Sequence, residues 1–143
     1  MSKIVCYLTY VSRCGGQYRQ RRTVPLGINA RQANLLVEIC ATPGLSQDAL
    51  AKRMFLNKSV VARLLADMEE QGFLKRPVCE KDRRVVRLHP TEKALEILPR
   101  LQKIEGDWER FLTSDMTAEE IATLEAVLCR LHTRAAQWTE VEE

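Results

Sequence analysis

Two short helical patterns separated by only three residues constrain the fold of this chain more than any other feature. Ser46 is placed to cap a first helix that carries Leu50 and Met54 on one face. The turn Phe55-Leu56-Asn57 follows, and a second, longer pattern then begins. Its inward face consists of Val61, Leu64, Leu65 and Met68. So tight a turn before a longer helix predicts a helix-turn-helix unit, with an ordinary helical hairpin as the alternative.

The segment after the second helix favours the helix-turn-helix interpretation. Gly72 ends that helix, and residues 73–79 and 84–88 then read as two strands around the polar tip 80–83. A β-hairpin at the exit of such a helix is a wing. The sequence therefore predicts a mainly α-helical fold with a small β-hairpin, namely a winged helix-turn-helix flanked by helices at both chain ends.

The second helix of the unit has a face suited to DNA. Asn57 can cap it, and at about 100° per residue the side opposite the apolar face carries small and polar side chains. Together with the lysine of the first turn, these are Lys58, Ser59, Ala62, Arg63 and Ala66. Small side chains let a helix enter a major groove about 12 Å wide, and Arg63 can donate to a guanine edge or a phosphate.

The wing is rich in arginine. Arg83 and Arg84 lie at its tip and base, and guanidinium suits a minor groove or its phosphates because it is planar, always charged and weakly hydrated. Asp82 lies two residues before Arg84, where its carboxylate can fix the arginine by a charge-assisted hydrogen bond. The alternative is a solvated hairpin turn with no role in binding.

The net charge of +3 hides an asymmetry along the chain. Residues 1–32 carry six basic and no acidic side chains, and residues 52–93 carry eleven basic and six acidic ones. Residues 94–143 reverse the balance, with five basic and eleven acidic side chains. A basic front suits a protein that faces nucleic acid, because attraction to phosphates is the sequence-independent part of binding. Solvated helix faces would give the same pattern without any DNA.

Both chain ends have helical periodicity. Pro25 ends a first amphipathic helix, Asn29 can cap the next, and Thr117 forms a capping box with Glu120 near the other end. The last helix then carries an apolar seam of Ile121, Leu124, Leu128, Leu131, Ala135 and Trp138. The seam could pack within one subunit or across a dimer. We favour a homodimer, because one winged domain would read only half of a palindromic site.

These segments together resemble the MarR family of bacterial transcription regulators. The matching motifs are LAKRM in the first short helix, K-S-V-V-A-R at Lys58 to Arg63, M-E-E-Q-G-F-L-K-R at Met68 to Arg76, and D-x-R at Asp82 and Arg84. With LGINARQANLL ahead of them, the resemblance covers nearly the whole chain. It implies a DNA-binding regulator, a dimeric repressor that a small molecule or an oxidant releases from a palindromic operator. It implies no enzymatic activity and no cofactor.

The resemblance also assigns roles by position. It makes residues 29–93 the winged DNA-binding lobe, and residues 1–24 and 94–143 the dimerisation helices, within a single domain of 143 residues. The major-groove readers would be Ser59, Val60, Ala62 and Arg63, while Asp82 would orient Arg84 in the minor groove. The chain departs from the family pattern after the wing. Pro90-Thr91 stands where Leu-Thr is usual, and Pro99 predicts a kink or early break in the helix that follows.

Two kinds of signal are open. Cys6, Tyr7 and Tyr10 resemble the start of the family's organic-hydroperoxide-sensing branch, in which a tyrosine hydroxyl would stabilise a reactive thiolate that peroxide oxidises. The alternative for Cys6 is a small core residue. Cys14 is unsuited as its disulfide partner, since eight residues along a helix span about 12 Å. Cys129 or a small-molecule thiol could resolve a sulfenate instead.

The second kind of signal is a small aromatic or lipophilic ligand. By resemblance to the family it would bind between the dimerisation helices and the winged lobes, in a pocket lined by Tyr18, Trp108, Phe111 and Met116. Aromatic residues at helical spacing also form simple core, which is the alternative for all four.

Other functional classes have less support. Five cysteines without a C-x-x-C pair, and two histidines far apart in sequence, argue against a zinc site. No Cys-His, Ser-His or paired-carboxylate motif indicates an enzyme. No apolar run approaches the roughly 20 residues that span a bilayer, and there is no signal-peptide pattern, so we expect a cytoplasmic protein without a membrane partner. A winged interaction module that has lost DNA binding is a further class, and Arg63, Asp82 and Arg84 argue against it.

Overall fold

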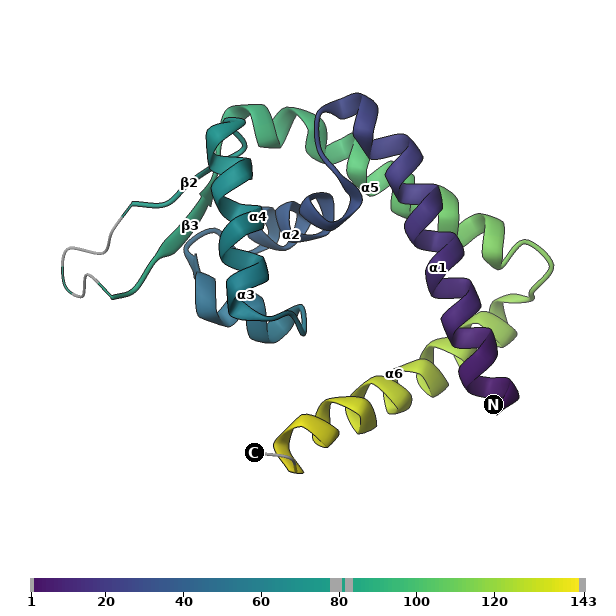
Figure 1. Cartoon of the computed structure of the whole chain (residues 1–143). Helices are drawn as coiled ribbons and strands as arrows, with labels where there is room; N and C mark the ends of the chain where they lie inside the picture. Colours follow the sequence, from purple (N-terminus) through teal and green to yellow (C-terminus); the bar gives the residue numbers. More distant parts are fainter. Residues whose placement is uncertain (1, 78–80, 82–83, 142–143) are drawn as a thin grey trace. The chain divides into compact units, whose positions relative to one another are not determined.

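The computed structural model describes residues 2–77, 81 and 84–141, which divide into two compact units, Met1–Trp108 and Glu109–Glu143 (Figure 1). The first unit comprises α1 (Lys3–Thr23), the 3₁₀ helix η1 (Val24–Leu26), α2 (Ala30–Ala41), β1 (Leu45–Ser46), α3 (Gln47–Arg53), α4 (Lys58–Glu70), β2 (Leu74–Lys75), β3 (Arg87–Pro90) and most of α5 (Glu92–Leu112). The second comprises the end of α5 and α6 (Ala118–Val141). None of the helices among these residues is long and apolar enough to cross a bilayer.

Local side chains set the starts of three helices in the first unit. Asn29 and Gln32 close a capping box before α2, with bonds of 2.9 and 3.2 Å between the side chain of each and the amide of the other. Ser46 Oγ accepts from the amide of Ala49 at 3.1 Å before α3. Asn57 Oδ1 accepts from the amide two residues on at 2.9 Å before α4. The three predicted N-caps are confirmed, and each is worth about 1 kcal/mol.

The core of the first unit lies among α2, α3, α4 and the sheet. Its fully buried members include Leu35, Leu36, Ile39, Leu50, Val61, Leu65, Met68 and Leu88. The predicted inward face of α4 is confirmed, with Leu64 partly buried against the same cluster. α5 adds Ala94 and Leu101. Burial of each large aliphatic side chain stabilises the unit by about 1.5–3 kcal/mol, so this cluster fixes how α4 is presented.

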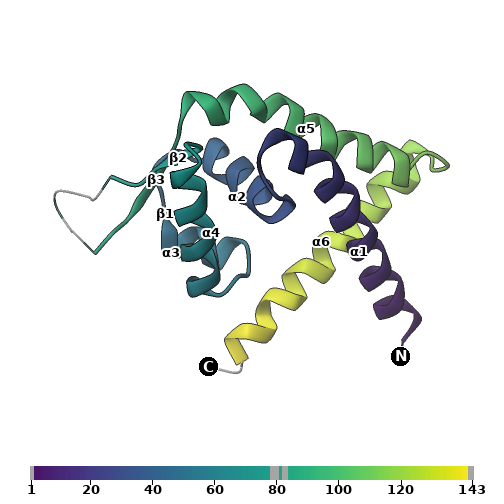
Figure 2. The same ribbon diagram turned by 45° about the horizontal axis from the view of Figure 1, so that its top comes forward.

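The wing is part of a three-stranded antiparallel sheet of order β1-β3-β2. Leu45 pairs with Leu88, and Leu74 pairs with Pro90. The predicted hairpin exists, but its strands are shorter and β3 begins three residues later than expected. The strand β1 was missed. β3 is the central strand: Arg87 and Leu88 pair with β1, whereas His89 and Pro90, beyond the expected end, pair with β2. Figure 2 shows the segments that follow β2 and precede β3 leading away from the helices of the lobe.

The helix after the wing does not end early at Pro99. α5 continues from Glu92 to Leu112 with Pro99 inside it, so the expected early break is wrong. Proline has no backbone N–H, so the carbonyl of Leu95 receives no hydrogen bond from position 99. Leu95 is 50% exposed, so water can serve that carbonyl, while buried Ala94 and Leu101 anchor the helix on either side.

The start of α5 holds the end of α4. Gly72 ends α4, as predicted, and it has a left-handed φ of +84°. Thr91 Oγ1 donates to the Gly72 carbonyl at 2.6 Å, and Lys93 Nζ donates to the Gln71 carbonyl at 2.6 Å. Lys93 also lies 4.4 Å from the ring centroid of Phe73. These contacts satisfy carbonyl groups that the end of a helix leaves without partners.

The second unit is built around α6. Thr117 Oγ1 accepts from the Glu120 amide at 3.1 Å, and Glu120 Oε2 accepts from the Thr117 amide at 2.9 Å. The predicted capping box is therefore confirmed. The apolar seam that follows is largely uncovered in the single chain, because Leu128, Leu131 and Trp138 are 41, 42 and 58% exposed.

Candidate nucleic-acid interface

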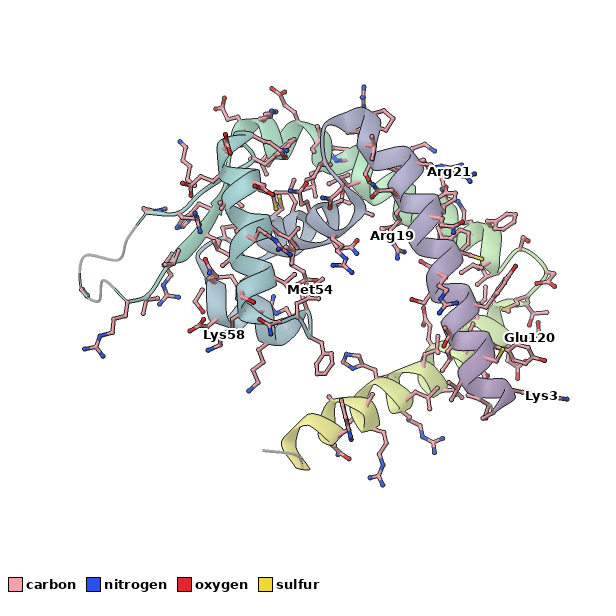
Figure 3. The ribbon with its side chains drawn as sticks, in the orientation of Figure 1. Lys3, Arg19, Arg21, Met54, Lys58 and Glu120 are labelled. Atoms are coloured by element: carbon pink, nitrogen blue, oxygen red, sulfur yellow. The ribbon has the colours of Figure 1, made fainter. Side chains whose placement is uncertain are left out.

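The first turns of α4 present the side chains predicted to read DNA. Lys58, Ser59 and Arg63 are exposed, and Val60 and Ala62 are partly buried. α4 is held from behind by the core, so these side chains lie on the side away from it. Figure 3 shows Lys58 at the end of the lobe where α3 and α4 meet. The local fold therefore leaves the predicted face of α4 open to a partner.

The cap of α4 also fixes the chemistry of Ser59. Its Oγ donates to Asn57 Oδ1 at 2.7 Å, and Asn57 Oδ1 accepts from the Ser59 amide as well. The hydroxyl proton is used in this bond, so the outward lone pairs of Ser59 act as acceptors. An acceptor there is suited to the exocyclic amino group of cytosine or adenine.

Two charges meet beside this face. Lys58 Nζ lies 3.8 Å from Asp48 Oδ1, and both side chains are 75% exposed. Lys58 stands in the first turn of α4, where the helix dipole disfavours a cation, whereas Asp48 stands in the first turn of α3, where the dipole favours an anion. Asp48 therefore offsets the charge of Lys58 in the free protein, a feature that sequence reasoning missed.

The wing contributes further cations to the same lobe. Lys81 and Arg84 are exposed, and Arg87 at the wing base donates from Nη1 to the Gly44 carbonyl at 3.2 Å. Asp82 and Arg83 lie outside the described residues, and with them the predicted pairing of Asp82 with Arg84. Arg87 was not among the predicted site residues, although its place in the arginine-rich segment could have suggested it.

The turn before α4 carries an exposed aromatic side chain. Phe55 is 65% exposed and has a φ of +54°, a left-handed conformation that is uncommon for a bulky residue. Its amide donates to the Lys52 carbonyl at 3.2 Å, and the next amide, of Leu56, donates to the Ala51 carbonyl at 3.0 Å. The turn is thus tight and strained beside the α4 face.

The residues predicted for peroxide sensing lie on the first half of α1. Cys6 is an exposed free thiol, and Tyr10, 70% exposed, stands one helical turn further on the same side. Cys14 and Cys40 are half-buried, and burial raises the pKa of the Cys40 thiol. No cluster of His, Cys, Asp or Glu among the described residues could hold a metal ion.

Two of the four predicted pocket residues meet in the first unit. The rings of Tyr18 and Trp108 lie 4.9 Å apart at 31°, and the Arg22 guanidinium lies 3.6 Å from the Tyr18 ring centroid. Arg19 Nε lies 3.6 Å from Glu105 Oε1, and Arg19 and Arg21 leave α1 on opposite sides (Figure 3). The arrangement is a packed stack of side chains that joins α1 to α5.

The other two predicted pocket residues belong to the second unit. Phe111 is 69% exposed, and Met116 is 39% exposed. Met116 lines an open hollow of about 740 Å³ together with Thr117, Leu124 and acidic side chains of the first turn of α6.

Comparison with known proteins gives a consistent result. The model of the MarR family matches residues 26–85. YybA, an uncharacterized HTH-type transcriptional regulator of Bacillus subtilis (strain 168), is 30% identical over 106 residues, which are 74% of this chain and 71% of that protein. A crystal structure of MarR matches with a TM-score of 0.82 at 29% identity, over 95% of this chain and 99% of that one.

A further solved structure has the same fold bound to DNA. It is a MarR family regulator from Listeria monocytogenes in complex with a 26mer DNA, and it matches with a TM-score of 0.93 over 99% of this chain and 95% of that one. At 20% identity this match establishes the shared fold alone.

Proposed function

Because this chain belongs to the MarR family of DNA-binding transcription regulators, which are not enzymes, we propose that it is a dimeric repressor of a roughly palindromic operator. A small molecule or an oxidant releases it from that operator. The observation that carries the proposal is the open face of α4, where Lys58, Ser59 and Arg63 are exposed in the same lobe as Arg84 of the wing. A cytoplasmic location follows from the proposal, because a regulator must reach the DNA it controls.

The chemistry of the lobe supports recognition by two elements. Ser59, Val60, Ala62 and Arg63 of α4 face the major groove, and Arg84, oriented by Asp82, enters the minor groove. Lys58 and Arg83 neutralise phosphates. Phosphate contacts of this kind hold the register, whereas base contacts of Arg63 and Ser59 select the sequence.

The uncovered apolar side chains support a homodimer. On α1, Ile4, Leu8 and Val11 are 64, 44 and 43% exposed, and the seam of α6 is uncovered as well. Large exposed apolar surfaces are typical of protein–protein interfaces. The charges agree, because residues 1–32 carry no acidic side chain whereas residues 94–143 carry eleven. Dimerisation through 1–24 and 94–143 would thus pair a basic segment with an acidic one.

The signal is assigned to one of two sites. In the thiol mechanism, the Cys6 thiolate attacks the outer oxygen of an organic hydroperoxide and the O–O bond breaks. The sulfur becomes a sulfenic acid, and the alkoxide that leaves takes a proton from water to give an alcohol. The exposure of Cys6, one turn from Tyr10, supports this route. In the ligand mechanism, a small aromatic molecule displaces the Tyr18–Trp108 stack within the first unit. A winged interaction module without DNA binding is the alternative of another class.

An anisotropy titration tests these assignments together. The probe is the labelled duplex upstream of the protein's own gene, titrated with reduced protein, with protein treated with an organic hydroperoxide, and with Cys6→Ser. Release by peroxide that the serine abolishes establishes the thiol mechanism. Tight binding that ignores peroxide leaves the ligand mechanism. A protein that binds no promoter fragment contradicts DNA recognition and leaves the interaction module.

A further inference from the structure

Arg76 lies at the base of the wing, between the end of α4 and the start of α3. It follows β2 directly, and its Nε donates to Glu69 Oε2 at 2.6 Å. Its Nη1 donates to Gln47 Oε1 at 3.5 Å. The Arg76 side chain is 24% exposed, whereas that of Glu69 is 45% exposed. The guanidinium is therefore largely withdrawn from solvent and has partners on two different helices.

The other strand of the wing is attached at the same place. The Gln47 amide donates to the Val86 carbonyl at 3.0 Å, just before β3 begins. Gln47 thus bonds through its backbone to the residue before β3 and through its side chain to the residue after β2. Both arms of the hairpin are fixed to the start of α3, and the arm that leaves β2 depends on the side chain of Arg76.

The charge of Glu69 explains why a cation is needed there. Glu69 and Glu70 stand in the last turn of α4, which has no basic side chain of its own. Carboxylates at the negative end of a helix dipole are destabilising unless a cation comes from elsewhere. Lys93 reaches the carbonyl of Gln71 from α5, and Arg76 reaches Glu69 from the wing. The pairing therefore ties the wing to the helix that carries the DNA-reading face.

We propose that Arg76 is a positioning residue, which with Glu69 holds the base of the wing so that Lys81 and Arg84 meet the DNA already in place. The inference rests on the proposed function, because it concerns how the same interface is pre-organised. The competing role for Arg76 is that of an ordinary surface cation that contacts a phosphate itself.

The variant Glu69→Gln separates the two roles, because they predict opposite signs. It keeps the charge of Arg76 but removes the carboxylate that holds it. A positioning role requires weaker DNA binding, whereas a phosphate contact requires unchanged or tighter binding, since a negative charge near DNA has gone. Glu70→Gln is the matched control, with the same charge change one position along on an exposed side chain.

The probe is a fluorescein-labelled duplex that the wild-type protein enriches from a random-sequence library. We expect Glu69→Gln and Arg76→Ala to weaken binding by about five- to tenfold, in the range of coupling between contacting groups. Glu70→Gln should leave affinity within about twofold of the wild type. Thermal melting checks folding, and the midpoint should fall by no more than about 2–4 °C because the pair is partly exposed. Should Arg76→Ala fail to fold, Glu69→Gln still shows whether loss of the ion pair weakens or strengthens DNA binding.

A double-mutant cycle with Arg84→Ala measures how strongly the effects of Arg76 and Arg84 on DNA affinity depend on each other. A general loss of stability would not produce such a dependence. If Arg76 acts by placing the wing, its substitution should cost less than about twofold once Arg84 is gone. If Arg76 contacts a phosphate, the loss should persist in that background and lower the slope of log affinity against log salt by about 1.

The outcomes distinguish the two proposals. Enrichment of no duplex by the wild type overturns DNA recognition and this inference with it. A wild type that binds DNA while Glu69→Gln binds equally well or better overturns this inference alone. If the effects of Arg76→Ala and Arg84→Ala on affinity are additive, this inference alone is likewise overturned. Weaker binding by Glu69→Gln, with an Arg76 effect that disappears without Arg84, establishes the positioning role.

Discussion

A Cβ atom built on Gly15 would lie 3.0 Å from Nε1 of Trp108 and 3.3 Å from Nη1 of Arg19. The missing side chain lets the indole of α5 lie directly against α1. We expect Gly15→Val to lower the free energy of unfolding by about 1–3 kcal/mol, because the added side chain must displace an indole that stacks on Tyr18. Urea denaturation measures the change.

Gly16 provides the control for that substitution. A Cβ atom there meets nothing within 4 Å, so Gly16→Ala should raise the free energy of unfolding by up to about 1 kcal/mol through helix propensity alone. Equal stability of Gly15→Val and Gly16→Ala would contradict the close contact of α1 with α5.

The left-handed Phe55 predicts a stabilising substitution. Its φ of +54° costs a non-glycine residue about 1–2 kcal/mol, and its ring is 65% exposed, so little burial is lost on replacement. Phe55→Asn should raise the free energy of unfolding by up to about 1 kcal/mol, because asparagine tolerates this conformation. The neighbouring Leu56→Asn, which removes a side chain packed against the core, should do the reverse. Calorimetry that ranks the two in the opposite order would refute the strain.

The Asp48–Lys58 pair predicts a variant with tighter DNA binding. Asp48→Asn removes an anion 3.8 Å from Lys58 and leaves that lysine free to meet a phosphate. We expect affinity for a duplex to rise by about two- to fivefold at low salt and the gain to shrink as salt increases. Asp67→Asn, the same change on an exposed residue near the far end of α4, is the control. An equal gain from both would mean that net charge alone is responsible.

The uncovered seam of α6 predicts a variant that stays monomeric. Leu131 is 42% exposed in the single chain, and a carboxylate at this position would be buried unpaired in a dimer. In light scattering we expect the mass of two chains for the wild type and the mass of one chain for Leu131→Glu. Thr133→Glu places the same charge about 200° away around the helix and should remain dimeric. A dimer that survives Leu131→Glu would remove the seam from the interface.

The features that the sequence predicted are those encoded within a few residues of one another. The caps at Asn29, Ser46 and Asn57 each join a side chain to an amide two or three residues on, so the motif alone identifies them. The buried face of α4 follows from helical spacing in the same way. The family resemblance likewise rested on motifs of a few consecutive residues.

The features that the sequence did not reveal depend on distant partners. β1 consists of only Leu45 and Ser46, and it is a strand because Leu88 pairs with it across the fold. Pairing of His89 and Pro90 with β2 likewise extends β3 beyond its expected end. Pro99 stays inside α5 because buried residues on both sides outweigh one lost hydrogen bond. The role of Arg76 likewise needs Glu69 and Gln47 brought together.

The pairing of Leu45 with Leu88 sets an order for folding. The N-caps of α2, α3 and α4 lie at the starts of their own helices, so the signals that begin these helices are local. Helices of 12, 7 and 13 residues are nevertheless marginal until they pack against one another. β1 and β3 can pair only after a loop of about 43 residues has closed, which makes the sheet the late, slow step. During synthesis the segment of α4 therefore leaves the ribosome before the wing, and the lobe is completed only when Leu88 emerges.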